Sequence, residues 1–287
     1  MAGFDWRRRR ELIAPLIPPL AATGAVAALA LAIAFWPVPE RRLGDGVSLP
    51  PLKPTDIHAG LDYSLHAVAE SKQAPRLIIR SLDADLGRIR DTDEKKRTFF
   101  RIMLPIVAAE NDRIRAERRR IAAASDAELA DLYRKYEVAT GDRAALLRRC
   151  DIVPASLALA QAAIESGWGA SRFARHGNNF FGMRTYDKDV PGIQPKEADG
   201  FKVTAFRDIR HSVRAYIRTI NTHGAYATFR RERARQRTPD GRVSGFRLVD
   251  HLTSYSEIRD QYAARLRQLI SRDRLQRFEG VRLKAKG

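Results

Sequence analysis

The sequence has almost no cysteine, since Cys150 is the only one among 287 residues. A single cysteine excludes a disulfide within the chain. The six histidines form no His-x-x-x-His pair, and no cysteine pair exists to complete a zinc site. No Cys–His pair stands at a spacing typical of a thiol nucleophile, so we expect Cys150 to be a packing residue. The sequence predicts neither a metal nor another cofactor.

Negative charge is also scarce. The chain has 52 lysines and arginines against 34 aspartates and glutamates, which gives a formal net charge of +18. No basic cluster is interleaved with aromatic residues as in a nucleic-acid-binding fold, so we expect no nucleic-acid partner. A basic surface suits an anionic polymer or an anionic bilayer. Hydrophobic residues make up 44% of the chain, which is enough for a real core, and nothing indicates the oligomeric state.

Long uncharged runs are absent except near the N-terminus. Four arginines at 7–10 precede an apolar stretch from Leu16 to Trp36, which is long enough to cross a bilayer. The arginines predict a cytoplasmic N-terminus, with everything after Trp36 on the far side. A signal peptide cleaved after Ala34 is the alternative, and it would give a secreted protein. In both cases the body of the protein is exported.

The rest of the chain divides by composition. Five prolines between residues 37 and 54 predict a semi-extended linker over residues 37–76. A helical pattern within 77–142 predicts a helical extension, in which Arg113 to Arg120 forms a solvated face. We expect the main domain over 143–275, with a loop and short β-hairpin at 185–204 and helices at 209–220 and 258–275. Residues 276–287 would be a basic tail. The predicted fold class is mainly α with a small β element.

The run from Leu157 to Tyr186 carries the strongest functional signal. It begins as an almost uncharged helix that ends on one carboxylate, Glu165, just before Ser-Gly-Trp-Gly. Burial and the negative end of the helix dipole both disfavour the ionised carboxylate. A carboxylic acid that stays protonated near neutral pH is what a general acid needs, so Glu165 is the candidate.

Several residues after Glu165 suit a sugar ligand. Asn178 and Asn179 offer amide donors and acceptors for hydroxyl-rich molecules, and Phe180 adds an apolar face. We expect Asn178 and Phe180 to line a cleft. Trp168 allows two interpretations, because an indole can stack on a sugar ring or can plug the core after a buried helix.

The segment AQAAIESGWGASRFARHGNNFFGM closely resembles the glucosaminidase domain of glycoside hydrolase family 73, a group of bacterial peptidoglycan hydrolases. The Bax-like branch is the nearer match, because residues 93–111 resemble the helical region that precedes the domain in that branch. Tyr255-Ser256-Glu257, followed by Tyr262, resembles its C-terminal signature. The resemblance covers roughly residues 75–270.

This resemblance implies a lysozyme-like α+β hydrolase domain at 143–275, in which a small β-lobe walls one side of a sugar cleft. It implies an endo-β-N-acetylglucosaminidase that cleaves β-1,4 bonds of peptidoglycan glycan strands. Combined with the N-terminal pattern, it places the protein in the bacterial inner membrane through residues 1–36, with its catalytic domain in the periplasm.

The resemblance also implies site residues. Glu165 matches the general acid of the family. Glu197, 32 residues downstream in the expected β-lobe, is the preferred second carboxylate, with three aspartates as rivals: Asp187, Asp189 and Asp199. Tyr226 matches a tyrosine that faces the cleft. Glu197 could activate water, act as a nucleophile, or be dispensable if the substrate's acetamido group assists.

Two other functions remain open at this point. A membrane-tethered protein could keep the fold and bind or assemble the wall without turnover. A lytic transglycosylase would need one glutamate and would form an anhydro sugar, so its product mass would distinguish it.

Overall fold

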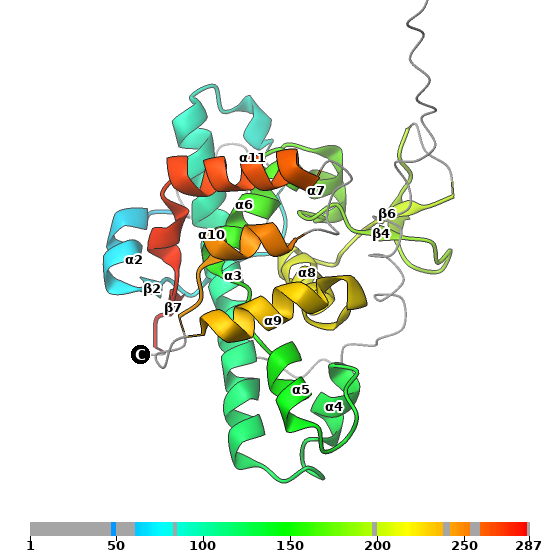
Figure 1. The fold of residues 1–287 in the computed structure, drawn as a ribbon. Coiled ribbons are helices and arrows are strands. Elements are labelled where there is room, and N and C mark those ends of the chain that lie inside the picture. Colours follow the sequence, from blue (N-terminus) through cyan, green and yellow to red (C-terminus); the bar gives the residue numbers. More distant parts are fainter. Residues whose placement is uncertain are drawn as a thin grey trace, which may run out of the picture.

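The computed structural model describes residues 47–49, 61–82, 85–196, 200–237, 242–252 and 259–285 (Figure 1). The expected anchor over residues 1–36 lies outside these ranges. Within them, no helix combines the length and the apolar character that crossing a bilayer requires. Helices dominate, and the strands are short, as the sequence predicted.

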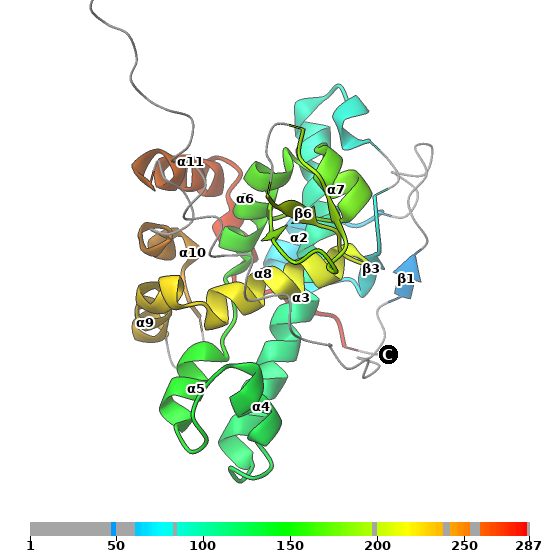
Figure 2. The same ribbon diagram turned by 90° about the vertical axis from the view of Figure 1, so that its right-hand side faces the viewer.

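The longest element is helix α3, Thr92–Ala123, which runs through the height of the molecule in both ribbon views (Figures 1 and 2). Asp91 starts it by accepting a hydrogen bond from the backbone N–H of Glu94 at 2.7 Å. Its middle section, which contains Phe99, Met103 and Val107, is fully buried. We expected this section to be part of a separate helical extension, but its apolar side chains are the centre of the fold.

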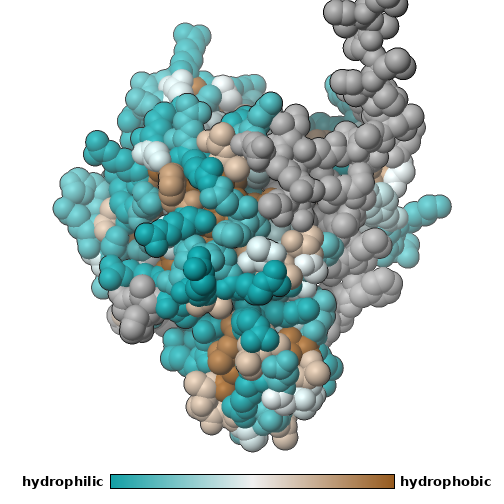
Figure 3. All heavy atoms as spheres, in the orientation of Figure 1, coloured by the Kyte–Doolittle hydropathy of each residue, from teal (hydrophilic) through white to brown (hydrophobic). Residues whose placement is uncertain are grey.

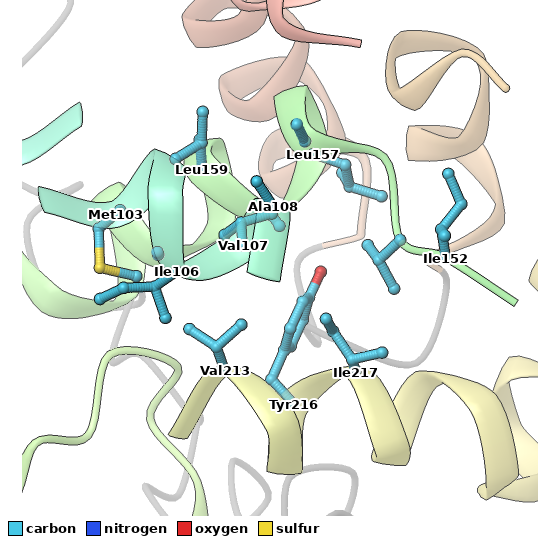
Figure 4. Packing of buried hydrophobic residues seen from close by; sticks show 14 of the residues in the cluster. Met103, Ile106, Val107, Ala108, Ile152, Leu157, Leu159, Val213, Tyr216 and Ile217 are labelled. Atoms are coloured by element: carbon cyan, nitrogen blue, oxygen red, sulfur yellow. The ribbon is translucent and has the colours of Figure 1, made fainter. Parts of the chain in front are cut away.

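Two helices pack on α3 and enclose the core. These are α6, Ala155–Ser166, and α8, Ile209–Thr222. Figure 4 shows Val107 of α3, Leu157 of α6 and Ile217 of α8 meeting in this core. Helix α6 has apolar residues around most of its circumference, which fits its burial on nearly every side. Helix α8 has one apolar face.

The second half of α3 extends away from this core and carries a lobe of short helices (Figure 2). The lobe contains α4, Ala130–Lys135, and α5, Arg143–Arg149, and α9, Ala227–Gln236, lies against α5. Glu128 accepts hydrogen bonds from the backbone N–H and the hydroxyl of Ser125 at 2.8 and 2.6 Å. This contact holds the turn that connects α3 to α4.

A small antiparallel sheet forms a second lobe, apart from the lobe of short helices. It has the order β4–β6–β5, with β4 at Arg184–Thr185, β5 at Gly192–Ile193 and β6 at Lys202–Thr204. Arg184 pairs with Val203, and Thr185 pairs with Lys202. The sequence predicted a hairpin here, and the structure adds a third strand. Helix α7, Arg172–Gly177, connects α6 to this β-lobe.

The C-terminal part returns to the body through α10, Gly245–Leu248, and α11, Arg259–Arg272. The 3₁₀ turn η4, Leu275–Phe278, follows, and β7, Arg282–Leu283, pairs with β2, Gln73–Ala74. Helix α2, Leu65–Ser71, precedes β2, and β1, Val47–Leu49, pairs with β3, Leu77–Ile79.

Two expected boundaries therefore differ from the structure. Residues 61–76 were expected in a linker, but Leu65 and Val68 are buried in the core. Residues after 275 were expected to form a basic tail, but Phe278 is fully buried. Charged residues in both segments, and prolines in the predicted linker, outnumber the few apolar residues that are buried. Elsewhere, the face in Figure 3 is mostly hydrophilic, with small hydrophobic patches.

Candidate active site

Helix α6 delivers Glu165 at its C-terminal end. Its sequence, ASLALAQAAIES, has no strong helix breaker, and Gly167 ends it in the left-handed conformation at φ 57°. Ser166 then closes the turn, because its hydroxyl accepts the N–H of Gly169 at 2.8 Å and donates to the carbonyl of Ala162 at 2.6 Å. The turn fixes the direction of the last helical residues, and with them the Glu165 carboxyl.

A chain of hydrogen bonds holds the Glu165 carboxyl from one side. Tyr262 on α11 donates its hydroxyl to Glu165 Oε1 at 2.8 Å. Gln161, one helical turn before Glu165, donates from Nε2 to the Tyr262 hydroxyl at 3.1 Å. Tyr216 on α8 donates to Gln161 Oε1 at 2.6 Å. Three helices thus contribute to the position of one carboxyl group.

The Tyr216 ring is fixed in turn by packing. It is stacked on Phe181, with ring centroids 4.0 Å apart and planes within 7°. Figure 4 shows its hydroxyl pointing away from α8, toward the helices packed above it. The chain from Phe181 to Glu165 therefore starts in the rigid core.

The surroundings of Glu165 favour its protonated form. Burial raises the pKa of Glu165 above its usual range. The Tyr262 hydrogen bond and the positive charges of Arg265 and Arg184 act in the opposite direction, but burial is the largest effect. The carboxyl has lost most of its water, and this burial supports the expectation of a raised pKa for Glu165.

Tyr226 lies close enough to Glu165 for the two side chains to interact electrostatically. It is in the 3₁₀ turn η2, Gly224–Tyr226, and its side chain is fully buried. Burial, followed by the charge of Glu165, raises the pKa of Tyr226, so its hydroxyl keeps its proton. Within the described part of the chain this hydroxyl has no hydrogen-bond partner. A buried hydroxyl is costly without a hydrogen-bond partner, so a polar group of a bound sugar would be stabilised at this position.

The chain before β4 passes very close to Glu165. Gly182 has φ 65°, and a Cβ built there would lie 3.5 Å from Glu165 Oε2. The positive φ favours glycine at this position. The absence of a side chain leaves the second carboxyl oxygen open on this side.

The structure places Trp168 against helix α3. Its ring lies 5.6 Å from Phe99 and 5.5 Å from Phe100 in edge-to-face contacts, and the Lys96 ammonium lies 5.6 Å from its centroid. Of the two interpretations from sequence, the packing plug fits these contacts.

The side chains of Asn178, Asn179 and Phe180 make contacts within the fold. Asn178 donates from Nδ2 to the carbonyl of Phe206 at 3.0 Å. Asn179 is buried and donates to the carbonyls of Met183 and Thr204, both at 2.8 Å. Phe180 is fully buried, and its centroid is 6.3 Å from that of Phe99. Their amide and apolar groups are used within the fold, which differs from the expected cleft lining.

The second carboxylate is not located by the structure. Glu197 and Asp199 lie outside the described residues. Of the other two rivals, Asp187 accepts the N–H of Asp189 at 2.9 Å and so stabilises its own loop, while Asp189 is exposed.

Other chemistry finds little support. Cys150 is buried, and burial raises the pKa of its thiol to about 12, so the thiolate is scarce at neutral pH. In the ranges that the structure describes, no three His, Cys, Asp or Glu side chains gather as metal ligands would.

Sequence reasoning missed the hydrogen-bond chain that holds Glu165. In the sequence, Tyr262 was named only as part of the C-terminal signature, and no role was assigned to Gln161 or Tyr216. One signal was available: Gln161 is a polar residue in an apolar helix, four positions before Glu165, and such residues share a helix face.

The chain is similar to known proteins in sequence and, more weakly, in structure. Residues 142–275 match the glucosaminidase family, described as mannosyl-glycoprotein endo-beta-N-acetylglucosaminidase. Protein bax of Escherichia coli (strain K12) is 33% identical, over 60% of this chain and 67% of that protein. The catalytic domain of the autolysin Auto from Listeria monocytogenes is 15% identical with a TM-score of 0.39, over 76% of this chain and 98% of that domain.

Glu165 and its hydrogen-bond chain lie within the matched range. The expected Bax-like relationship is confirmed by the identity to Protein bax. The chain belongs to the glucosaminidase family, in the branch of Protein bax, and is a glycoside hydrolase.

Proposed function

We propose that the protein is an endo-β-N-acetylglucosaminidase that cleaves β-1,4 bonds in peptidoglycan glycan strands, with Glu165 as the general acid. The observation that carries this proposal is a carboxyl with a pKa raised by burial, held by Tyr262 inside the glucosaminidase range. Bond cleavage requires a proton on the leaving oxygen, and a protonated Glu165 supplies it.

A lysozyme-like arrangement would place the sugar between the end of α6 and the β-lobe. The support is that Glu165 ends α6 while Gly182, at the entry to β4, lies next to its carboxyl oxygen. A glycosidic oxygen presented at this opening would meet the proton of Glu165 without crossing a side chain.

The neighbours of Glu165 act by positioning it. Tyr262 holds one carboxyl oxygen, and its hydrogen bond becomes stronger when Glu165 turns into a carboxylate. Tyr226 differs: within the described residues its buried hydroxyl makes no hydrogen bond to Glu165, and it would hold the substrate's acetamido group or the partner of the nucleophile. Both tyrosines remain protonated because burial raises the pKa of each.

Glu197 is the proposed second group. In the sequence it lies between β5 and β6, which are strands of the β-lobe. The chain reaches this lobe through Gly182, next to Glu165. In this position it would activate a water molecule or attack the sugar directly, unless the substrate's acetamido group takes that role.

One experiment tests the proposed reaction. Purified peptidoglycan is digested, and the new ends are identified by mass spectrometry. A reducing N-acetylglucosamine end is expected, and an anhydro sugar would instead establish a lytic transglycosylase. The anomeric configuration of the new end then shows whether the reaction inverts or retains. If a Glu197→Gln variant still cleaves the bond with retention, the substrate's acetamido group assists the reaction.

The membrane anchor is a separate proposal. We infer from the apolar run between Leu16 and Trp36, which follows four arginines, that the protein is held in the inner membrane with its domain in the periplasm. Full-length protein should then stay in the membrane pellet through high-salt and carbonate washes. A mature N-terminus just after Ala34 would instead establish a secreted protein.

A further inference from the structure

The exposed face of residues 182–186 begins at the catalytic carboxyl. Burial alternates along this segment: Met183 and Thr185 are 1% and 2% exposed, whereas Gly182 and Arg184 are partly exposed and Tyr186 is 39% exposed. Alternation is expected for an extended strand, so Gly182, Arg184 and Tyr186 share the outer face. Since Gly182 touches Glu165, this face leads outward from the site of bond cleavage.

Tyr186 is unusual on the surface. Among the described residues it is the only large hydrophobic side chain classed as exposed. Continuing the β4–β6 register by one residue places it opposite Phe201, and the two ring centroids are 6.1 Å apart. The ring is thus supported by the partner strand while one side remains open to solvent.

Arg184 lies between the carboxyl and this ring. Its guanidinium packs over Phe201 at 4.3 Å from the ring centroid, and its charge lowers the pKa of Glu165. No carboxylate in the described ranges lies within ion-pair distance of it. An arginine held by an aromatic ring in this way is ready to bind an anionic or hydroxyl-rich ligand.

We propose that the outer face formed by Gly182, Arg184 and Tyr186 is a binding subsite for the glycan strand beside the scissile bond. Tyr186 stacks on the apolar face of a sugar ring, and Arg184 pairs with a carboxylate of the peptide stem. From Gly182 to Tyr186 the strand spans about 13 Å, at about 3.3 Å per residue, which leaves room for more than one sugar ring. This inference rests on the proposed glycosidase function and assigns part of its substrate binding.

The test compares Tyr186→Ala with wild type on purified peptidoglycan. Loss of the stacking ring should raise KM about tenfold, as expected for one aromatic contact, with little change in kcat. Tyr186→Phe keeps the ring and should restore KM to within a few-fold of wild type. Lys188→Ala, in the neighbouring exposed loop, is the control for a general disturbance of the lobe and should behave as wild type.

A second measurement separates the two contacts. Binding is measured in the Glu165→Gln background, with peptide-bearing glycan strands and with chitotetraose, which has no carboxylates. Arg184→Gln should weaken binding of the peptide-bearing strands by several-fold more than binding of chitotetraose, whereas Tyr186→Ala should weaken both.

An unchanged KM and unchanged binding in Tyr186→Ala would overturn the subsite. Equal losses for both ligands in Arg184→Gln would overturn the carboxylate contact. Neither result depends on the catalytic role of Glu165, because a failure of the proposed function would appear as normal turnover by Glu165→Gln. The two proposals can therefore fail separately.

Discussion

At the scale of single residues, the Glu165 carboxyl is balanced between opposing effects. Burial favours its protonated form, whereas the Tyr262 hydroxyl and two arginines favour the carboxylate. This balance suits a group that must first give a proton to the leaving oxygen and then exist briefly as an anion.

Replacing Tyr262 by phenylalanine should shift this balance in a defined direction. The hydrogen bond from Tyr262 lowers the pKa of Glu165, so its loss should raise that pKa further and move the falling alkaline limb of the pH–rate profile to higher pH. The rate should also fall by about tenfold or more, because a hydrogen bond to a charged group contributes about 1.5 to 3 kcal/mol.

Tyr133→Phe is a matched control, because the Tyr133 hydroxyl also donates to a carboxylate, that of Asp126, at 2.8 Å. Its pH–rate profile should overlay that of wild type. An alkaline limb that stays in place or moves to lower pH in Tyr262→Phe would contradict the assigned role of this tyrosine.

The residues show how far sequence reasoning extends. Glu165 was predicted because its local pattern, an apolar helix ending at glycines, already determines its burial. Tyr262 lies 97 positions downstream, and only the packing of α11 on α6 brings it to Glu165. The contacts of Asn179 could not be predicted for the same reason, since the sequence does not reveal that backbone carbonyls of the β-lobe accept hydrogen bonds from its amide.

At the scale of secondary-structure elements, helix α6 depends on a cap that is distant in sequence. It starts at Pro154 without a cap from its own side chains. Instead, the Glu279 carboxyl accepts the Ser156 hydroxyl at 2.5 Å and the N–H of Gly245 at 3.0 Å, together with backbone N–H groups at the start of α6. The C-terminal segment thus secures the helix that carries Glu165.

This cap should make stability depend on pH. Burial raises the pKa of Glu279 to about 7, whereas an unfolded glutamate has a pKa of about 4.3. Between these values the folded protein keeps the proton and the unfolded chain has released it, so the free energy of unfolding should fall as pH rises through this window.

Glu279→Gln should remove this part of the pH dependence, since the amide does not ionise. The measurement is the melting temperature of wild type and variant from pH 4.5 to 7.5. Parallel curves for the two proteins across that range would contradict the role of Glu279.

At the scale of the whole molecule, a buried charge cluster joins the segment before the matched domain to the domain itself. Glu110 of α3 is fully buried and contacts three arginines: Arg113 at 2.9 Å, Arg210 at 2.6 Å and Arg214 at 2.9 Å. Arg210 and Arg214 are on α8. The charges of these arginines hold the pKa of Glu110 well below its usual range, despite its burial.

The division of the chain into a helical extension and a separate hydrolase domain therefore does not describe the packing. The periodicity of α3 was recognised from sequence, but its partners were not, because an amphipathic pattern shows that a face is buried without showing against what. The range that matches the glucosaminidase family begins at residue 142, yet the core of the domain continues into α3.

Removing the cluster should therefore destabilise the entire protein. Glu110→Ala leaves three half-buried arginines without their buried carboxylate and should lower the free energy of unfolding by about 3 to 5 kcal/mol. Glu70→Ala, which removes an exposed partner of His66, should cost less than about 1 kcal/mol. Urea unfolding followed by circular dichroism and tryptophan fluorescence should show one coincident transition. Two separate transitions, or equal effects of the two variants, would contradict this account.

The central claim is that Glu165 donates the proton that breaks the glycosidic bond. The most direct measurement is the rate at which wild type and Glu165→Gln release soluble fragments from purified peptidoglycan. The amide preserves the shape of the side chain and removes the transferable proton, so the rate should fall about a hundredfold or more while melting temperature and wall binding stay close to wild type. Release of fragments at the wild-type rate by Glu165→Gln would contradict the account.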